Sequence, residues 1–161
     1  MLASAVGAGL LVGLALRGSL ANLAAVEVRW MALLIAAVTA RLIAMAPFAD
    51  MRGIAHFLSL ALIALFAASN LRLTGARLAM LGSGLNAAVV GINGGAMPVT
   101  PEAAGLIQAQ ATADSLHALS RDAAPFGDVL ALPPLGVYSV GDVMLSVGVF
   151  LFTVSSMRTA K

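Results

Sequence analysis

The stretch GLNAAVVGINGGAMPVTPEA, Gly84 to Ala103, starts as an apolar helix and ends in a loop rich in glycine and proline. Asn93, Gly94 and Gly95 tolerate positive φ angles, and Pro98 follows where it no longer disrupts the preceding turn, so the pattern predicts a helix that stops at Asn93. An apolar run that ends in this way at a polar loop is typical of a membrane helix.

The composition of the whole chain is also that of a membrane protein. Of its 161 residues, 61% are hydrophobic and 10% are charged, and the mean hydropathy is +1.01. The net charge of +2 comes from basic residues that stand singly between apolar runs, which argues against nucleic acid as a partner. The chain has no cysteine, which excludes disulfides, thiolate catalysis and cysteine-bound metals.

Five apolar segments predict an all-α integral membrane protein, a bundle of about five transmembrane helices in a single membrane domain. A long extracytoplasmic connection, residues 94–138, precedes the last helix and carries most of the acidic side chains. The first segment is the shortest, and the number of spans is odd only if this segment crosses fully. The segments run approximately over residues 2–16, 30–46, 54–68, 76–92 and 139–156.

The basic residues near the ends of these segments predict the orientation of the chain. Arginine and lysine are enriched in cytoplasmic loops. The richer side is therefore expected to be cytoplasmic, with the C-terminus there and the N-terminus and the long connection outside. One side collects Arg17, Arg29, Arg72, Arg77, Arg158 and Lys161, and the other collects Arg41, Arg52 and Arg121.

Asn86 and Asn93 are the polar residues of the fourth segment that need an explanation. They are seven residues apart, so both project from one helix face, and an amide in hydrocarbon must find a partner. The favoured interpretation is a hydrogen bond to a neighbouring helix, and the alternative is a polar pocket. Small residues that would let helices approach closely are Gly84, Ala88 and Gly91 in this segment and Gly9 and Gly13 in the first.

A second polar cluster precedes the last helix, where Gly-Asp-Val occurs twice, at Asp128 and at Asp142. Ser139 and Asp142 have the spacing of a capping box, in which each side chain bonds the main chain of the other residue. Asp142 can alternatively hold a proton or cation, since carboxylates within membranes tend to be functional. Because both clusters fall on the outer side, we expect an outward-facing polar pocket formed by Asn86, Asn93, Asp128 and Asp142.

Other motifs predict little chemistry. Thr100 and Pro101 have the pattern of a helix start and predict a short surface helix to about Leu119. His56 and His117 are the only histidines, and their positions match neither a haem site nor a metal motif. The sequence therefore predicts no cofactor, no metal and no assigned catalytic residue.

The segments GLNAAVVGINGGAMPVT, FGDVLALP and SVGDVMLSVG, in this order after LRGSL, resemble a bacterial family of small multi-pass membrane proteins that is catalogued as a domain of unknown function. The resemblance implies a location in the bacterial inner membrane and no activity. Ser19 stands where another glycine would be expected. The positions that carry the resemblance are Asn86, Asn93, Gly94, Gly95, Met97, Pro98, Asp128, Gly141 and Asp142.

Two functional hypotheses follow from these residues. The first is a non-catalytic role, as a membrane subunit or as a small binding or transport module that uses the outer pocket. The alternative is an intramembrane enzyme that acts on a lipid-like substrate, with Asp128 and Asp142 as acid and base and Asn86 or Asn93 orienting the substrate. The expected partners are the lipid bilayer and either another protein or a second copy of the chain.

Overall fold

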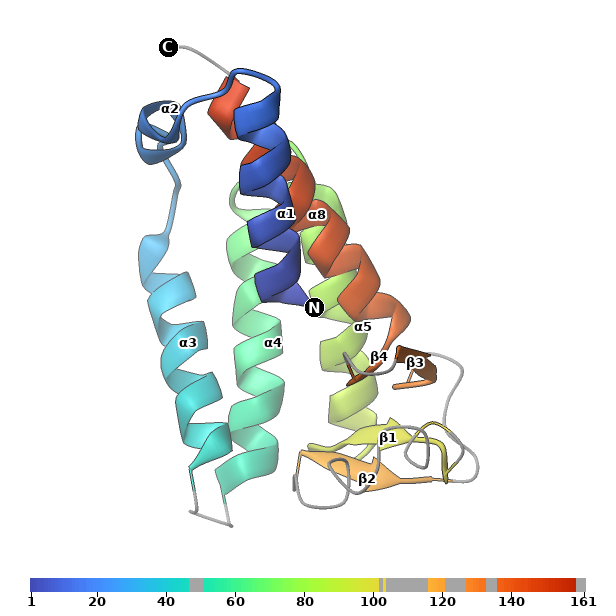
Figure 1. Ribbon diagram of the computed structural model, residues 1–161. Coiled ribbons are helices and arrows are strands. Elements are labelled where there is room, and N and C mark those ends of the chain that lie inside the picture. The colour runs from blue at the N-terminus through green and yellow to red at the C-terminus, as the bar shows by residue number, and fades with distance from the viewer. Residues whose placement is uncertain (47–50, 102, 104–115, 121–126, 133–135, 159–161) are drawn as a thin grey trace.

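Helices make up most of the protein in the computed structural model, which describes residues 1–46, 51–101, 103, 116–120, 127–132 and 136–158 (Figure 1). The helices are α1 (Leu2–Ala15), α2 (Leu20–Ala24), α3 (Met31–Met45), α4 (Arg52–Ala68), α5 (Ala76–Ile92) and α8 (Val140–Arg158). Apart from α2, their bounds agree within two residues with the apolar segments of the sequence. The prediction of a mostly helical protein is confirmed.

Only α8, among the described helices, is both long and apolar enough to cross a membrane by the usual criteria of length and hydropathy. The other four long helices have 14 to 17 residues. At a rise of 1.5 Å per residue they extend over about 21 to 26 Å, which is less than the roughly 30 Å of a typical hydrocarbon core. The structure therefore does not by itself support five spans.

The long helices form a row in the order α3, α4, α5, α8 and α1, in which each helix packs mainly against its neighbours. The row is bent, since α1 lies in front of α4 in Figure 1. The neighbours run antiparallel except for α1 and α8. Gly9 faces Thr153 and Gly13 faces Met157, so α1 and α8 run in the same direction. Both expected glycines of the first segment thus lie in a helix contact.

Glycines also allow α5 and α8 to pack closely, but they are not the small residues that the sequence suggested. A Cβ on Gly148 would lie 2.7 Å from the main-chain nitrogen of Ala79, and one on Gly82 would lie 2.7 Å from that of Leu145. Main-chain atoms cannot move aside as a flexible side chain can. Only glycine therefore fits at Gly82 and Gly148.

The small residues of α5 that were expected to pack against another helix, Gly84, Ala88 and Gly91, do not lie on the face of Gly82 that contacts α8. A Cβ on Gly84 would lie 4.0 Å from the Cβ of Ala64, which is ordinary contact, and a Cβ on Gly91 would lie 3.2 Å from the ring of Phe57. Ala88 is exposed, so the packing expected of it is not seen within this chain. The reason is geometric, because residues 82 and 84 differ by about 200° around a helix.

Four short strands, which the sequence did not predict, lie at one end of the row (Figure 1). β1 (Met97–Val99) pairs in parallel with β2 (His117–Leu119), and β3 (Leu130–Leu132) pairs antiparallel with β4 (Gly136–Tyr138). The surface helix expected up to Leu119 is therefore wrong at its end, because β2 satisfies the main-chain groups of β1 instead. The cap at its start is present, since the Ala103 N–H donates to Thr100 Oγ1 at 3.2 Å, and most of the remainder lies outside the described residues.

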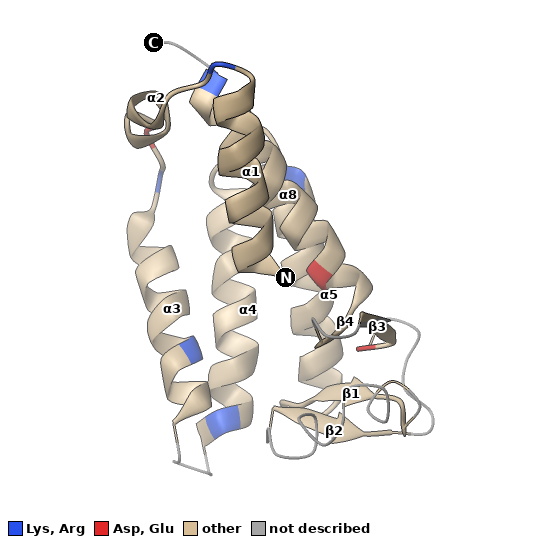
Figure 2. Cartoon of the chain, in the orientation of Figure 1, with Lys and Arg blue, Asp and Glu red and all other residues tan. Residues whose placement is uncertain are grey.

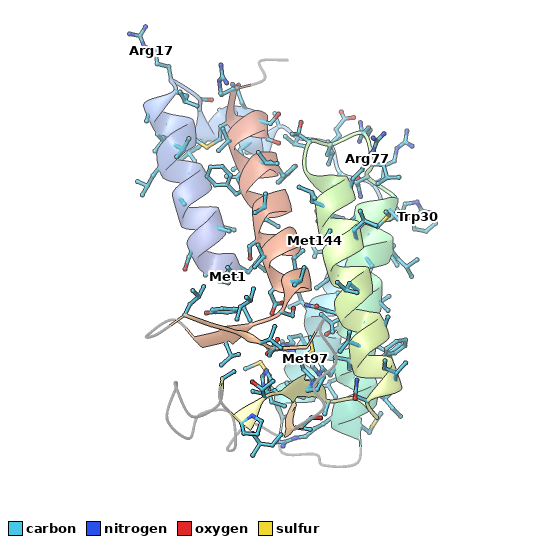
Figure 3. The ribbon with its side chains drawn as sticks, turned by 90° about the vertical axis from the view of Figure 1, so that its right-hand side faces the viewer. Met1, Arg17, Trp30, Arg77, Met97 and Met144 are labelled. Atoms are coloured by element: carbon cyan, nitrogen blue, oxygen red, sulfur yellow. The ribbon has the colours of Figure 1, made fainter. Side chains whose placement is uncertain are left out.

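The surface of the row is apolar along the helices and basic toward their ends. Leu11, Leu42 and Ile92 are 71%, 63% and 79% exposed, and Figure 3 shows side chains projecting from the helices to both sides. Figure 2 shows the described arginines toward the two ends of the helices. Arg121 and Lys161 lie outside the described residues.

Candidate functional site

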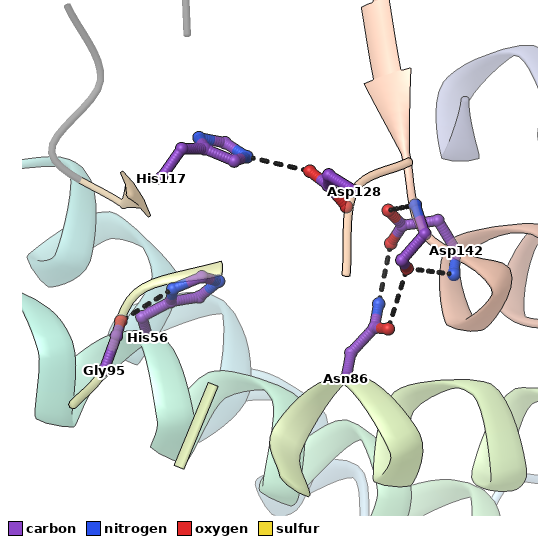
Figure 4. A network of polar contacts seen from close by, with 7 residues as sticks. His56, Asn86, Gly95, His117, Asp128 and Asp142 are labelled. Carbon is purple, nitrogen blue, oxygen red and sulfur yellow. Dashed lines mark hydrogen bonds and ion pairs between the residues drawn. The ribbon is translucent and has the colours of Figure 1, made fainter. Parts of the chain in front are cut away.

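Asn86, Ser139 and Asp142 form one hydrogen-bonded cluster that joins α5 to the start of α8 (Figure 4). Asn86 Nδ2 donates to Asp142 Oδ1 at 2.9 Å, and Ser139 Oγ donates to Asn86 Oδ1 at 2.8 Å. The Asp142 N–H donates to Ser139 Oγ at 2.9 Å, and the Ser139 N–H donates to Asp142 Oδ2 at 3.1 Å. The expected capping box is present, and Asn86 closes it from the neighbouring helix.

This cluster satisfies its own members. Asn86 is 1% exposed and Ser139 is 0% exposed, and both carboxylate oxygens of Asp142 accept a hydrogen bond. Buried polar groups that are fully paired make a helix contact specific and leave little capacity for a ligand. The part of Ser139 in joining the two helices was not predicted, because its spacing indicated only a cap.

Asp128 and His117 form a second polar pair beside this cluster (Figure 4). Asp128 Oδ2 lies 3.1 Å from His117 Nε2. The Asp128 N–H donates to the Pro98 carbonyl at 2.9 Å, and a main-chain bridge to Val99 holds Asp128 alongside β1. β1 also pairs with the strand that carries His117, so this one strand brings the two side chains together.

The carboxylate of Asp128 is the least satisfied polar group of the site. Asp128 is only 3% exposed, and its Oδ1 has no hydrogen-bond partner among the residues that the structure describes. Burial raises the pKa of Asp128, and the charge of Asp142 raises it further, while the hydrogen bond and charge of His117 act in the opposite direction. The pairing of Asp128 with His117 was not predicted from the sequence.

His56, near the start of α4, lies below His117 in Figure 4. It is 5% exposed, and its Nδ1 lies 3.2 Å from the Gly95 carbonyl oxygen. A Cβ on Gly53 would lie 3.0 Å from the Cα of Gly95, so the absence of side chains on both residues lets α4 approach the loop after α5. This approach could not be predicted from the sequence, because Gly53 and Gly95 belong to distant segments.

Asn93 does not belong to the site, although the sequence analysis placed it there. It is exposed, and its Nδ2 donates to the Val89 carbonyl of its own helix at 2.7 Å. Gly94 and Gly95 follow with φ angles of 65° and 94°, and the Gly95 N–H bonds the Val90 carbonyl at 2.8 Å. Asn93 is therefore the helix terminator that the pattern also predicted.

Three of the four expected pocket residues thus lie together, and among them Asp128 has a carboxylate oxygen, Oδ1, without a hydrogen-bond partner in the described part of the chain. Within the described part of the chain, no three histidine, aspartate or glutamate side chains are placed to hold a metal ion. A cavity of about 260 Å³ lies at the opposite end of the helices, among residues such as Asn22 and Arg72. It is not the expected pocket of Asn86 and Asp142.

The comparisons with known proteins identify a family and no activity. Residues 21–154 match the model described as Family of unknown function (DUF5317). Comparison with curated proteins and with solved structures found no similar chain in either. The match includes both polar clusters, α2 to α5 and most of α8.

Proposed function

Because the chain belongs to DUF5317, a family of unknown function, we propose a role for it from the geometry of its site. The protein is an integral membrane protein of five spans that binds a small ligand at Asp128 on the outer side. The carrying observation is the buried Asp128 carboxylate, whose Oδ1 has no partner among the described residues. The role is a non-catalytic one, as a binding or transport module of the bacterial inner membrane.

The exposed apolar side chains support the membrane location. Large apolar residues on α1, α3, α4 and α5 are more than half exposed, among them Leu11, Ile35, Ile54 and Leu81. Soluble proteins rarely expose contiguous apolar surface of this extent. Lipid would cover these faces, while thinning of the bilayer and snorkelling of the flanking residues would accommodate the shorter helices.

The distribution of arginine supports the orientation. Arg17, Arg29 and Arg72 lie beyond helix ends on one side of the row, and Arg77 and Arg158 lie in the end turns of α5 and α8 on that same side. Arg41 and Arg52 lie toward the other side, next to the strands. With the arginine-rich side in the cytoplasm, Asp128 faces outward.

The state of Asp128 indicates what it would bind. A buried carboxylate oxygen without a partner is costly, and a hydrogen-bond donor that reaches it recovers that free energy. Because Asp128 is only 3% exposed, a ligand that reaches its carboxylate must be small. We therefore expect a proton or a small N–H cation such as ammonium.

The same hydrogen bonds argue against the enzymatic alternative. A general acid and a general base both need access to the reacting atoms. Both oxygens of Asp142 already accept hydrogen bonds, so Asp142 is not placed to work with Asp128 as an acid–base pair. Asn93, which would orient the substrate in that alternative, donates instead to a carbonyl of its own helix.

The membrane location and orientation can be tested by labelling single cysteines, because the native chain has none. Ala118 on β2 and Leu71 between α4 and α5 are both exposed. In intact cells, a membrane-impermeant maleimide should label Ala118→Cys and should label Leu71→Cys only after lysis. Labelling of both variants in intact cells, or of neither, would contradict the proposed topology.

Binding at Asp128 can be tested with ammonium chloride as the probe. Ammonium should raise the thermal midpoint of the detergent-solubilised protein, whereas tetramethylammonium chloride at the same ionic strength should not, because it has no N–H donor. Asp128→Asn should lose this difference, and Asn93→Ala, outside the site, should keep it. A difference that persists in Asp128→Asn would rule out binding at this carboxylate.

A further inference from the structure

The cavity at the cytoplasmic end of the proposed membrane protein lies where three segments meet. These are α2 with the chain that follows it, the connection between α4 and α5, and the last turns of α8. Its volume of about 260 Å³ is just below the range of roughly 300 to 1,000 Å³ for sites of drug-sized ligands. It therefore suits a small polar group. Its polar lining consists of Asn22, Glu27, Arg72, Thr74, Ser155 and Ser156.

Hydrogen bonds hold the walls of this cavity together. Arg72 Nη2 donates to the Glu27 carbonyl oxygen at 2.6 Å, and the hydroxyl oxygens of Thr74 and Ser155 lie 3.0 Å apart. Asn22 Nδ2 donates to the Met157 carbonyl at 3.0 Å. Each bond links two of the three segments, so the cavity is formed before any ligand arrives and binding requires little reorganisation.

The lining combines donors for an anion with one carboxylate. A guanidinium, hydroxyls and an amide are the groups that bind phosphate oxygens, and arginine can do so with two N–H groups at once. Glu27 adds a negative charge at the same wall, next to Arg72. A ligand that fits both must carry a phosphate and, close to it, a cationic donor.

The surroundings of the cavity favour a phosphate. Arg17, Arg29 and Arg158 lie at this end of the helices, as does Arg77. Figure 3 shows Arg17, Arg77 and Trp30 at this end, far from Met97 on β1. Glu27 is the one acidic residue here within the described part of the chain, so the net charge around the cavity is positive.

We infer that this cavity binds a phosphodiester that carries a primary amine, the chemistry of a phosphatidylethanolamine headgroup, with the phosphate at Arg72 and the amine at Glu27. That the group comes from a lipid rests on the proposed membrane location, whereas the binding chemistry does not. Basic pockets at the cytoplasmic ends of membrane helices are known places for phospholipid headgroups.

The first test uses glycerophosphoethanolamine and the full chain in detergent. Binding is followed by calorimetry and by the fluorescence of Trp30, the single tryptophan, three residues after Glu27. Arg72→Gln should weaken binding at least tenfold, Arg72→Lys should recover part of the loss, and Arg77→Gln, which does not line the cavity, should bind as the native protein does. Native affinity in an Arg72→Gln variant with an unchanged thermal midpoint would overturn the inference.

The second test asks whether the amine is recognised. Glycerophosphocholine has no N–H donor, so it should bind several-fold more weakly than glycerophosphoethanolamine, and Glu27→Gln should remove that difference. If inorganic phosphate binds as tightly as glycerophosphoethanolamine, the site recognises only an anion and the headgroup assignment is wrong.

The third test separates a lipid from a soluble source. In phosphatidylcholine nanodiscs, added glycerophosphoethanolamine should bind, whereas in phosphatidylethanolamine nanodiscs the lipid should already occupy the site and prevent this. Equal binding in both nanodiscs would overturn the lipid source. If glycerophosphoethanolamine binds in detergent but the cysteine-labelling test fails, the membrane location is refuted and the binding chemistry of the cavity is not.

Discussion

Asp128 should govern how the stability of this protein depends on pH. Its pKa in the folded chain is raised above the ordinary value of 3.8, mainly by burial. A carboxyl group of this kind binds a proton more tightly in the folded than in the unfolded chain, so its contribution to stability is complete below pH 3.8 and is lost as the pH rises through the folded pKa. His117 and Asp142 are the titratable groups that act on it.

We therefore expect Asp128→Asn to be more stable than the native chain at neutral pH, since a neutral amide removes the cost of the buried charge. The advantage should shrink as the pH falls toward 4. The measurement is the thermal midpoint of both proteins across this range, in one detergent. A constant difference at all pH values would show that the pKa of Asp128 is the same in the folded and the unfolded chain.

Arg17 has a backbone conformation that glycine adopts more easily. Its φ is 62°, directly after α1, where helices often end in a glycine. The next residue, Gly18, must itself remain glycine, because a Cβ at Gly18 would lie 2.8 Å from the Gly13 carbonyl oxygen. Arg17→Gly should therefore stabilise the chain by about 0.5–1 kcal/mol.

Chemical denaturation in detergent would measure this gain, and Arg17→Ala is the matched control. Alanine removes the charge and keeps the side chain that disfavours positive φ. If Arg17→Ala stabilises as much as Arg17→Gly, the gain comes from the charge and not from the backbone.

The candidate site shows what sequence can reveal about single residues. Ser139 and Asp142 are three residues apart, so their capping box could be predicted from local spacing. The bond from Asn86 to Asp142 joins different helices, and the sequence indicated only that Asn86 needed a partner. The pairing of Asp128 with His117 depends on the strand β1, which left no periodic signal in the sequence because it has three residues.

Among the elements, the contact between α5 and α8 depends most on the absence of side chains. A Cβ at Gly148 would lie 2.7 Å from the Ala79 nitrogen and from the Gly75 carbonyl oxygen, so Gly148→Ala must separate the two helices. We expect a loss of about 2 kcal/mol or more, measured by denaturation in detergent.

Gly7→Ala in α1 is the control for this prediction. A Cβ there would meet nothing within 4 Å, so alanine should be neutral or should gain up to about 1 kcal/mol from its higher helix propensity. Equal losses at Gly7 and Gly148 would mean that alanine acts through the backbone and not through the helix contact.

The helices could be predicted more reliably than their contacts. Each apolar run is too long for a strand, so the runs predict helices. All five predicted segments start and end within two residues of the observed helices, which are α1, α3, α4, α5 and α8. The face by which α5 packs was not predicted, because small residues occur on more than one side of it. Gly82 contacts α8 and Gly84 lies near α4, which the sequence alone does not distinguish.

At the scale of the whole molecule, the row of helices bears on what surrounds the protein. Each helix packs mainly against its neighbours in the row, and large apolar side chains such as Leu11, Ile35 and Ile54 stay more than half exposed. In the proposed membrane location, lipid covers these side chains.

For the proposed membrane protein, the lengths of the helices should decide which bilayer gives the highest stability. The helices α1, α3, α4 and α5 have 14, 15, 17 and 17 residues and extend over about 21 to 26 Å. Each Å of mismatch with the hydrocarbon core costs a fraction of a kcal/mol. In nanodiscs of one headgroup, the thermal midpoint should therefore be highest with short acyl chains and should fall as the chains lengthen. The length of α8, 19 residues, can be accommodated by tilt. A midpoint that rises with acyl-chain length would show that these short helices do not set the hydrophobic thickness of the protein.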